Sequence, residues 1–165
     1  PGAWEVQPGL SSSEVRLRSR LGRPFKLRLM PPSGEVFVDF VAGTPAPGWL
    51  RIPLMLDVPQ AAKRDRSRLL EDLFDALRYP MAGLRLYEAA PDGSGHWRAG
   101  ALLTIAGICD RVPPLVTCDS KTDTGQFLLV EVRFRLSEFG IDGRARGIGG
   151  QAYLRLRLAL SVCAP

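Results

Sequence analysis

Cysteine and histidine are scarce in this sequence, and their spacing excludes the common metal and haem sites. The chain has three cysteines, Cys109, Cys118 and Cys163, and one histidine, His96. No C-x-x-C pair occurs, so neither a zinc nor a haem site is expected. On one strand Cys109 and Cys118 would lie about 30 Å apart, too far to bond. Cys163 could pair with either from a neighbouring strand, but we expect three small, buried apolar side chains.

The sequence also lacks membrane-spanning and catalytic signatures. No apolar run reaches the ~18 residues that a transmembrane helix needs, and neither a P-loop nor a G-x-S-x-G motif is present. Asp65, Asp72 and Asp75 fall in one helical segment, where carboxylates more often have a structural role than an acid–base one. His96 lies beside a turn signal and is expected to face solvent. We therefore predict a protein that is not an enzyme and that needs no cofactor or metal.

The charge is basic but spread out. Lys and Arg total 22 against 17 Asp and Glu, a formal net charge of +5, and lysine occurs only at Lys26, Lys63 and Lys121. An arginine bias can reflect phosphate recognition or simply genomic base composition. The arginines alternate with apolar residues, and five consecutive basic residues never occur. This pattern is typical of the solvent-exposed face of a sheet. We expect no specific nucleic-acid partner.

Alternation of apolar and polar residues dominates the chain and predicts strands. Apolar residues make up 45% of the sequence, enough for one domain spanning residues 1–165. Pro- and Gly-rich loops are expected at 43–48 and 140–150. Besides a short extended piece at Trp4 to Val6, about nine strands are predicted, at residues 14–20, 25–29, 35–40, 49–58, 81–87, 97–106, 112–118, 127–136 and 153–162.

One segment has helical periodicity instead. From Lys63 to Pro80 the apolar residues recur at spacings of three and four, which predicts an amphipathic helix that packs over the sheet. Tyr79 and Pro80 are expected to end it. The apolar stripe consists of Leu69, Leu70, Leu73, Phe74 and Leu77.

Many strands with one apolar face each favour a mainly β fold. A closed antiparallel up-and-down β-barrel with one helical crossover buries all these faces and leaves few strand edges exposed. A barrel of this size either fills its interior with side chains or holds one long apolar ligand.

Four motifs, in order along the chain, resemble those of the YceI-like family. Trp4 and Ser13 fit its N-terminal pattern. Arg64-Asp65, Leu69, Asp72 to Asp75 and Tyr79-Pro80 resemble its R-D-x-x-L-x-x-x-D-F-F-D-x-x-x-Y-P run. Gly100 with Leu103 to Gly107 resembles its G-x-L-T-I-x-G strand, and Ser137 to Ile141 resembles its S-D-F-G-I turn.

The resemblance implies a lipocalin-like barrel of bacterial, periplasmic or secreted proteins that bind a long isoprenoid, quinone or fatty-acid chain for storage or transport. An arginine near the mouth could contact a charged head group. A homodimer and a monomer both remain open. The alternative is a barrel with a filled core that binds an anionic partner through its arginine-rich outer face. The residues expected to contact an apolar ligand are Leu17, Val38, Phe40, Leu54, Leu56, Leu84, Leu86, Ile105, Val132, Phe134, Leu156 and Leu158.

Overall fold

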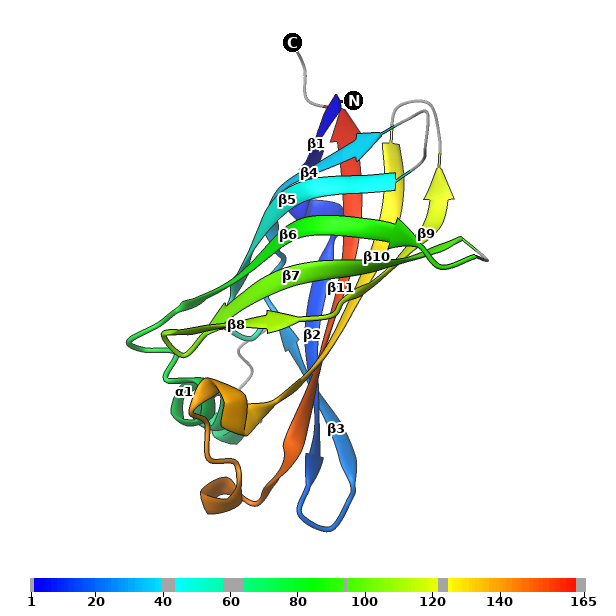
Figure 1. Cartoon of the computed structure of the whole chain (residues 1–165). Coiled ribbons are helices and arrows are strands. Elements are labelled where there is room, and N and C mark those ends of the chain that lie inside the picture. Colours follow the sequence, from blue (N-terminus) through cyan, green and yellow to red (C-terminus); the bar gives the residue numbers. More distant parts are fainter. Residues whose placement is uncertain (1, 40–43, 58–63, 94, 122–124, 163–165) are drawn as a thin grey trace.

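The protein is a closed, mainly antiparallel β-barrel with one α-helix (Figure 1). The computed structural model describes residues 2–39, 44–57, 64–93, 95–121 and 125–162. The elements are β1 (Gly2–Val6), η1 (Pro8–Leu10), β2 (Ser12–Ser19), β3 (Pro24–Leu29), β4 (Ser33–Asp39), β5 (Thr44–Pro53), α1 (Arg64–Phe74), β6 (Met81–Pro91), β7 (His96–Ile105), β8 (Ile108–Val112), β9 (Leu115–Lys121), β10 (Gly125–Arg135), η3 (Leu136–Phe139), η4 (Arg144–Arg146) and β11 (Ile148–Val162).

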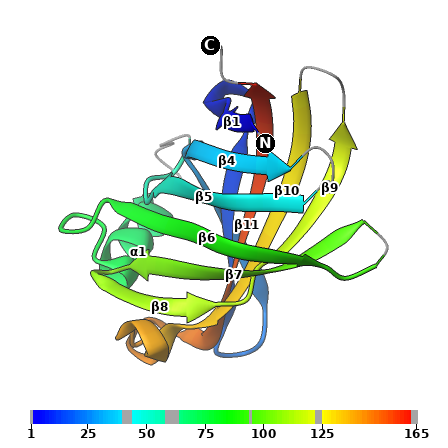
Figure 2. The same cartoon turned by 45° about the horizontal axis from the view of Figure 1, so that its top comes forward.

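Closure of the sheet joins the two ends of the chain. The strand order runs β1-β4-β5-β6-β7-β9-β10-β11, and β1 then pairs with the end of β11, with Trp4 opposite Val162. The remainder of β11 pairs with β2, which pairs with β3. A bridge between Leu29 and Leu56 closes this second circuit against the segment after β5. In Figure 2 the strands β4 to β7 cross over β9, β10 and β11, so the barrel wraps around one interior.

The side-chain alternation that predicts the strands separates the interior from the solvent. From Gln126 to Phe134 of β10 and from Ala152 to Leu158 of β11 every second residue is buried, because successive side chains of a strand point to opposite faces. Closing the sheet brings these apolar faces together in one cluster that includes residues of β1 to β11 and of α1.

Helix α1 covers the lower end of the barrel in Figure 1 and is shorter than predicted. Leu70, Leu73 and Phe74 are buried, as the apolar stripe predicts. The helix ends at Phe74, because Asp75 takes a left-handed conformation with φ of 50°, which aspartate adopts more readily than most residues. The following turn directs Leu77 into solvent at 82% exposure, so its predicted place in the stripe is wrong.

The strand count and two connections also differ from the prediction. The sheet has eleven strands. Pro113 and Pro114 divide the predicted strand 112–118 between β8 and β9, because proline donates no hydrogen bond to a ladder.

At the predicted loop 43–48 the structure instead has the beginning of β5, next to a register shift between Val36 and Phe37. Gly48 permits close approach there, since a Cβ on it would come within 2.6 Å of the Glu35 carbonyl oxygen. At the other predicted loop, 140–150, β11 begins early, at Ile148.

We expect the α1 contact to be a large source of stability. Phe74→Ala removes a side chain that is 0% exposed and should lower the free energy of unfolding by about 3–5 kcal/mol. Leu77→Ala, three residues on and exposed, is the matched control and should change it by less than about 0.5 kcal/mol. Urea unfolding followed by circular dichroism measures both; equal losses would contradict the packing described here.

Candidate functional site

The inner wall of the barrel is the candidate site, and it is lined by apolar side chains from nearly every strand. Ten of the twelve predicted contact residues have side chains that the structure describes, and each is 6% exposed or less. All belong to the single interior cluster. They are Leu17, Leu54, Leu56, Leu84, Leu86, Ile105, Val132, Phe134, Leu156 and Leu158.

The other two predicted contact residues have no described side chain. Val38 is placed only by its backbone, in β4 opposite Gly2 of β1 and Pro45 of β5. Phe40 lies outside the described residues. Whether any of the twelve touches a ligand stays a prediction.

A single uncharged amide interrupts the apolar wall at one end of β10. Gln126 is 5% exposed, and its Nε2 group has no hydrogen-bond partner among the described residues. Its Oε1 atom accepts a long contact of 3.9 Å from the Cys118 thiol. A buried donor without a partner is costly, so this amide is suited to a polar group of a ligand. The sequence signal that could have identified it is a glutamine at an inward position of the strand.

Two other buried polar side chains, Ser13 and Ser11, already have hydrogen-bond partners. Ser13 donates to the Met30 carbonyl at 3.2 Å. Ser11 accepts from the Ala159 backbone N–H at 2.9 Å and donates to the Gln7 carbonyl at 2.7 Å. These hydroxyls hold strands together and do not offer free groups to the interior.

The opposite end of β10 is covered by α1 and the segment after β10. Phe134 and Phe139 meet edge to face, with ring centroids 5.3 Å apart. Leu136 and Phe139 are each 1% exposed. An ion pair of 3.0 Å between Asp72 of α1 and Arg146 of η4 ties the two covering segments together.

The residues that resemble the family motifs meet largely at this covered end. The Tyr79 ring packs on Gly107, where a Cβ would come within 2.7 Å of the ring. Gly140 takes a left-handed conformation, with φ of 66°, and ends η3 so that Ile141 turns back into the interior. The motifs therefore specify how the end of the barrel is covered.

No acid–base or metal arrangement emerges among the described residues. Asp72 is paired with Arg146, and the Asp75 carbonyl accepts the Tyr79 N–H at 2.8 Å. His96 is partly buried, and its Nδ1 atom lies 2.8 Å from the Thr117 hydroxyl, so the predicted solvent-facing position is wrong. No group of three metal-ligating side chains occurs in this part of the chain.

The prediction of small buried cysteines is not met either. Cys109 is an exposed free thiol on β8, and Cys118 is half-buried on β9. Cys109 is the second residue of the short strand β8, which the sequence did not separate from its neighbours. Cys163 lies outside the described residues.

The outer face of β10, β11, β2 and β3 gathers basic side chains around shallow hollows. One hollow of about 270 Å³ is lined by Arg16, Lys26, Arg28, Arg155 and Arg157, among others. Glu14 lies between two of these arginines, 2.8 Å from Arg16 and 3.9 Å from Arg155. These basic residues are those that alternate with the buried ones, so the same strands build both faces.

Tyr153 contacts two of the arginines on this outer face. The Arg16 and Arg133 guanidinium groups lie 5.8 Å and 5.7 Å from the centre of its ring, and all three residues are cross-strand neighbours. Such contacts favour an extended and ordered arginine side chain.

No described helix has the length and apolar character needed to span a membrane.

The chain was compared with known protein families, curated proteins and solved structures. No protein-family model and no curated protein matches the chain. The structure of Burkholderia cenocepacia BcnA superposes with a TM-score of 0.78 and 19% sequence identity, over 93% of this chain and 98% of that one.

Two further matches share the architecture. A domain from Saccharophagus degradans, described as polyisoprenoid-binding and implicated in plant cell wall breakdown, gives a TM-score of 0.75 at 11% identity, over 98% of this chain and 99% of that one. The Campylobacter jejuni YceI protein gives 0.62 at 13% identity, over 83% and 84% of the two chains. The resemblance noted in the sequence is thus confirmed at the level of the fold: this chain has the β-barrel fold of the YceI protein structure.

Proposed function

We propose that the protein binds one long apolar molecule, an isoprenoid, a quinone or a fatty-acid derivative, inside the barrel and stores or carries it. The observation that supports this proposal is the single apolar cluster inside the closed barrel, at the edge of which Gln126 supplies one amide without a partner among the described residues. Each methylene group that a ligand buries would contribute about 0.8 kcal/mol before the costs of ordering.

The geometry gives the proposed ligand an orientation. Phe134 and Gln126 lie at opposite ends of β10, about 26 Å apart at ~3.3 Å per residue. The Phe134 end is covered by η3 and α1. At the other end Gln126 pairs with Leu160, which pairs with Val6 where β1 closes the barrel. The apolar tail would therefore extend towards the covered end, and a polar group would lie near Gln126.

The proposal treats the protein as a binding protein and not as an enzyme. The description of the Saccharophagus domain as polyisoprenoid-binding supports the ligand class. A periplasmic or secreted location in a bacterium belongs to the same proposal and rests on the sequence resemblance alone.

A first test looks for ligand carried through purification. Organic extracts of the protein, analysed by mass spectrometry, should contain an apolar chain compound in near-stoichiometric amount. An extract of the Leu156→Phe variant described next should contain much less. Repeatedly empty extracts from the unmodified protein, together with no binding of added lipid, would contradict the proposal.

A second test narrows the interior. Leu156→Phe places a larger side chain in the inner wall and should weaken the binding of cis-parinaric acid, measured by its fluorescence, at least tenfold. Leu129→Phe makes the same change on the outer face of β10 and should leave the affinity within twofold. Overpacking costs about 1–3 kcal/mol of stability, so Val132→Ile is a milder inner variant if Leu156→Phe does not fold. Equal effects of inner and outer changes would argue against an internal ligand.

A third test concerns the amide. Gln126→Leu should raise the free energy of unfolding of ligand-free protein by about 1–2 kcal/mol, because it removes a buried donor that has no partner among the described residues. It should also weaken binding of a short-chain ubiquinone about fivefold, while a hydrocarbon of similar length binds unchanged. Gln151→Leu, at an exposed position of β11, is the control. Unchanged quinone binding would remove Gln126 from the site.

A further inference from the structure

The tip of the β2–β3 hairpin exposes a large apolar side chain between arginines. Leu21 is 97% exposed, more than any other large hydrophobic side chain that the structure describes. Arg20 precedes it, and Arg18 and Arg23 lie on either side of the turn. In Figure 1 this hairpin extends beyond the covered end of the barrel.

Hydrogen bonds hold this tip in a defined conformation. The Ser19 N–H donates to the Arg23 carbonyl at 2.9 Å, and the Gly22 N–H donates to the Ser19 carbonyl at 2.8 Å. The Arg18 guanidinium donates to the Gly22 carbonyl at 3.3 Å. Leu21 is therefore presented to solvent by an ordered turn, and its exposure carries no compensating contact within the described structure.

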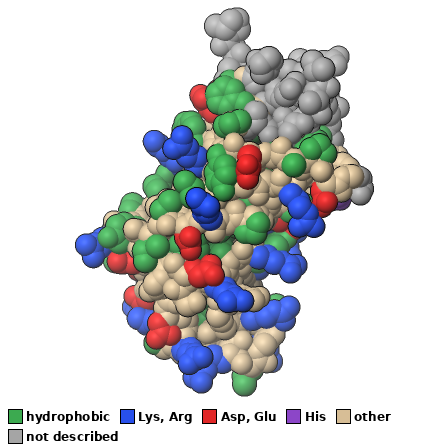
Figure 3. Space-filling view, viewed as in Figure 1, with side chains coloured by type: hydrophobic (Ala, Val, Ile, Leu, Met, Phe, Trp, Pro, Cys, Tyr) green, Lys and Arg blue, Asp and Glu red, His purple; other side chains and the backbone are tan. Residues whose placement is uncertain are grey.

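A second basic segment lies beside the tip. The Arg20 N–H donates to the Gly147 carbonyl at 2.9 Å, which places η4, with the exposed Arg144 and Arg146, next to the hairpin. Acidic groups also lie at this end. The Asp142 side chain accepts the Arg144 backbone N–H, and Asp72 is paired with Arg146. Glu138 of η3 and Asp75 after α1 are exposed. Figure 3 shows Lys and Arg side chains at this lower end, with Asp and Glu side chains beside them.

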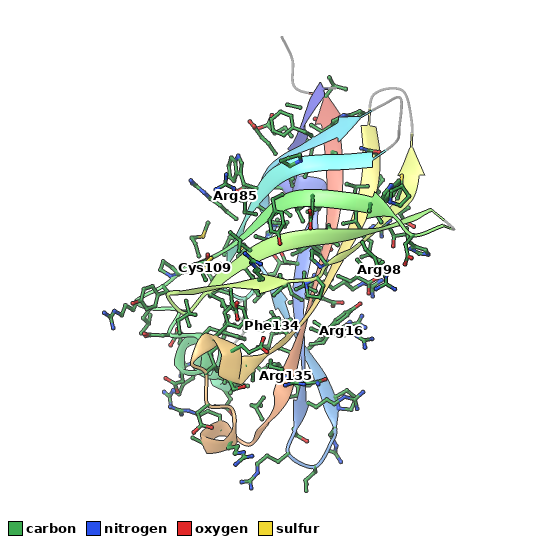
Figure 4. All side chains as sticks on the ribbon, in the orientation of Figure 1. Arg16, Arg85, Arg98, Cys109, Phe134 and Arg135 are labelled. Atoms are coloured by element: carbon green, nitrogen blue, oxygen red, sulfur yellow. The ribbon has the colours of Figure 1, made fainter. Side chains whose placement is uncertain are left out.

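The positive charge continues from the tip along the strands. From Val15 to Gly34 the sequence has no acidic residue. Arg16, which projects outward from β2 above the hairpin in Figure 4, lines the basic hollow together with Lys26 and Arg28. An approaching negative surface would thus meet the tip first and the basic outer face of β2 and β3 behind it.

We infer that this tip docks on an anionic lipid bilayer, with Leu21 among the lipid chains and the five arginines Arg18, Arg20, Arg23, Arg144 and Arg146 at the level of the head groups. An exposed aliphatic side chain surrounded by basic ones matches both the apolar and the charged layers of such a surface. A nucleic acid would bind the arginines but gain little from Leu21, since its outer surface is phosphate and sugar. This docking does not depend on the proposed internal ligand.

Sedimentation with lipid vesicles tests the inference. The unmodified protein should partition at least tenfold more strongly to vesicles with about one third phosphatidylglycerol than to pure phosphatidylcholine, and raising the salt to about 0.5 M should weaken the binding. Replacing Arg18, Arg20 and Arg23 by Gln should weaken it about 100-fold, at about fivefold for each arginine. Leu21→Ser should weaken it about tenfold.

Matched variants separate the tip from net charge and general hydrophobicity. Replacing Arg51, Arg85 and Arg111 by Gln lowers the net charge by the same amount at exposed positions of β5, β6 and β8. On a logarithmic scale, its loss of vesicle affinity should be less than about a third of the loss caused by replacing Arg18, Arg20 and Arg23. Leu10→Ser, at the last residue of η1, which is 70% exposed, should change the binding by less than twofold.

Three outcomes would overturn the inference: equal losses from the two arginine triples, unchanged binding of Leu21→Ser, or equal binding to both kinds of vesicle. Duplex DNA of about 20 base pairs is added as a competing partner. If it is bound more tightly than the anionic vesicles and Leu21→Ser has no effect, the tip is a nucleic-acid contact instead. All variants should keep the circular dichroism spectrum of the unmodified protein.

Discussion

The whole structure depends on closing one sheet on itself. In a closed sheet each strand has a neighbour on both sides, and successive side chains must alternate between interior and solvent. β11 makes the closure by pairing with β10 along one edge and with β2 and β1 along the other. Once these ladders form, the apolar leucines of β11 can only face inwards and Arg155 and Arg157 can only face outwards. The proposed ligand site and the basic outer face therefore follow from the same pairing.

Much of the fold could be predicted from the sequence because period-two alternation is a direct readout of burial on one face. Leu154 and Leu156 are buried and their neighbours Tyr153, Arg155 and Arg157 are not, as the pattern indicates. The pattern fails where backbone geometry decides. Aspartate in a left-handed conformation ended α1 early at Phe74, and Pro113 with Pro114 interrupted a ladder. Neither event changes local hydrophobicity, so periodicity cannot report it.

Some residues of the candidate site could be predicted from the sequence and others could not. Inward leucines could be predicted individually, whereas the unpartnered amide of Gln126 depends on which groups from β9 and β11 surround it, which no single strand reveals. The arginines illustrate the converse. Their alternation correctly indicates a wet face, but the clustering of Arg18, Arg20 and Arg23 with Arg144 and Arg146 depends on the contact between Arg20 and Gly147, far apart in sequence.

The pairing of the first strand with the last also governs how the molecule can assemble. Trp4 and Val6 meet Val162 and Leu160, so the ring cannot close until β11 has been synthesised. Until then the growing sheet has open edges and an exposed apolar face, the state most prone to aggregation. Contacts between residues so far apart in sequence also form slowly, because the chain loses the entropy of loop closure before the strand pairing contributes favourable free energy. A barrel closed in this way folds as one unit only once β11 is available, and a shortened chain that lacks β11 would lose the interior and the basic face together.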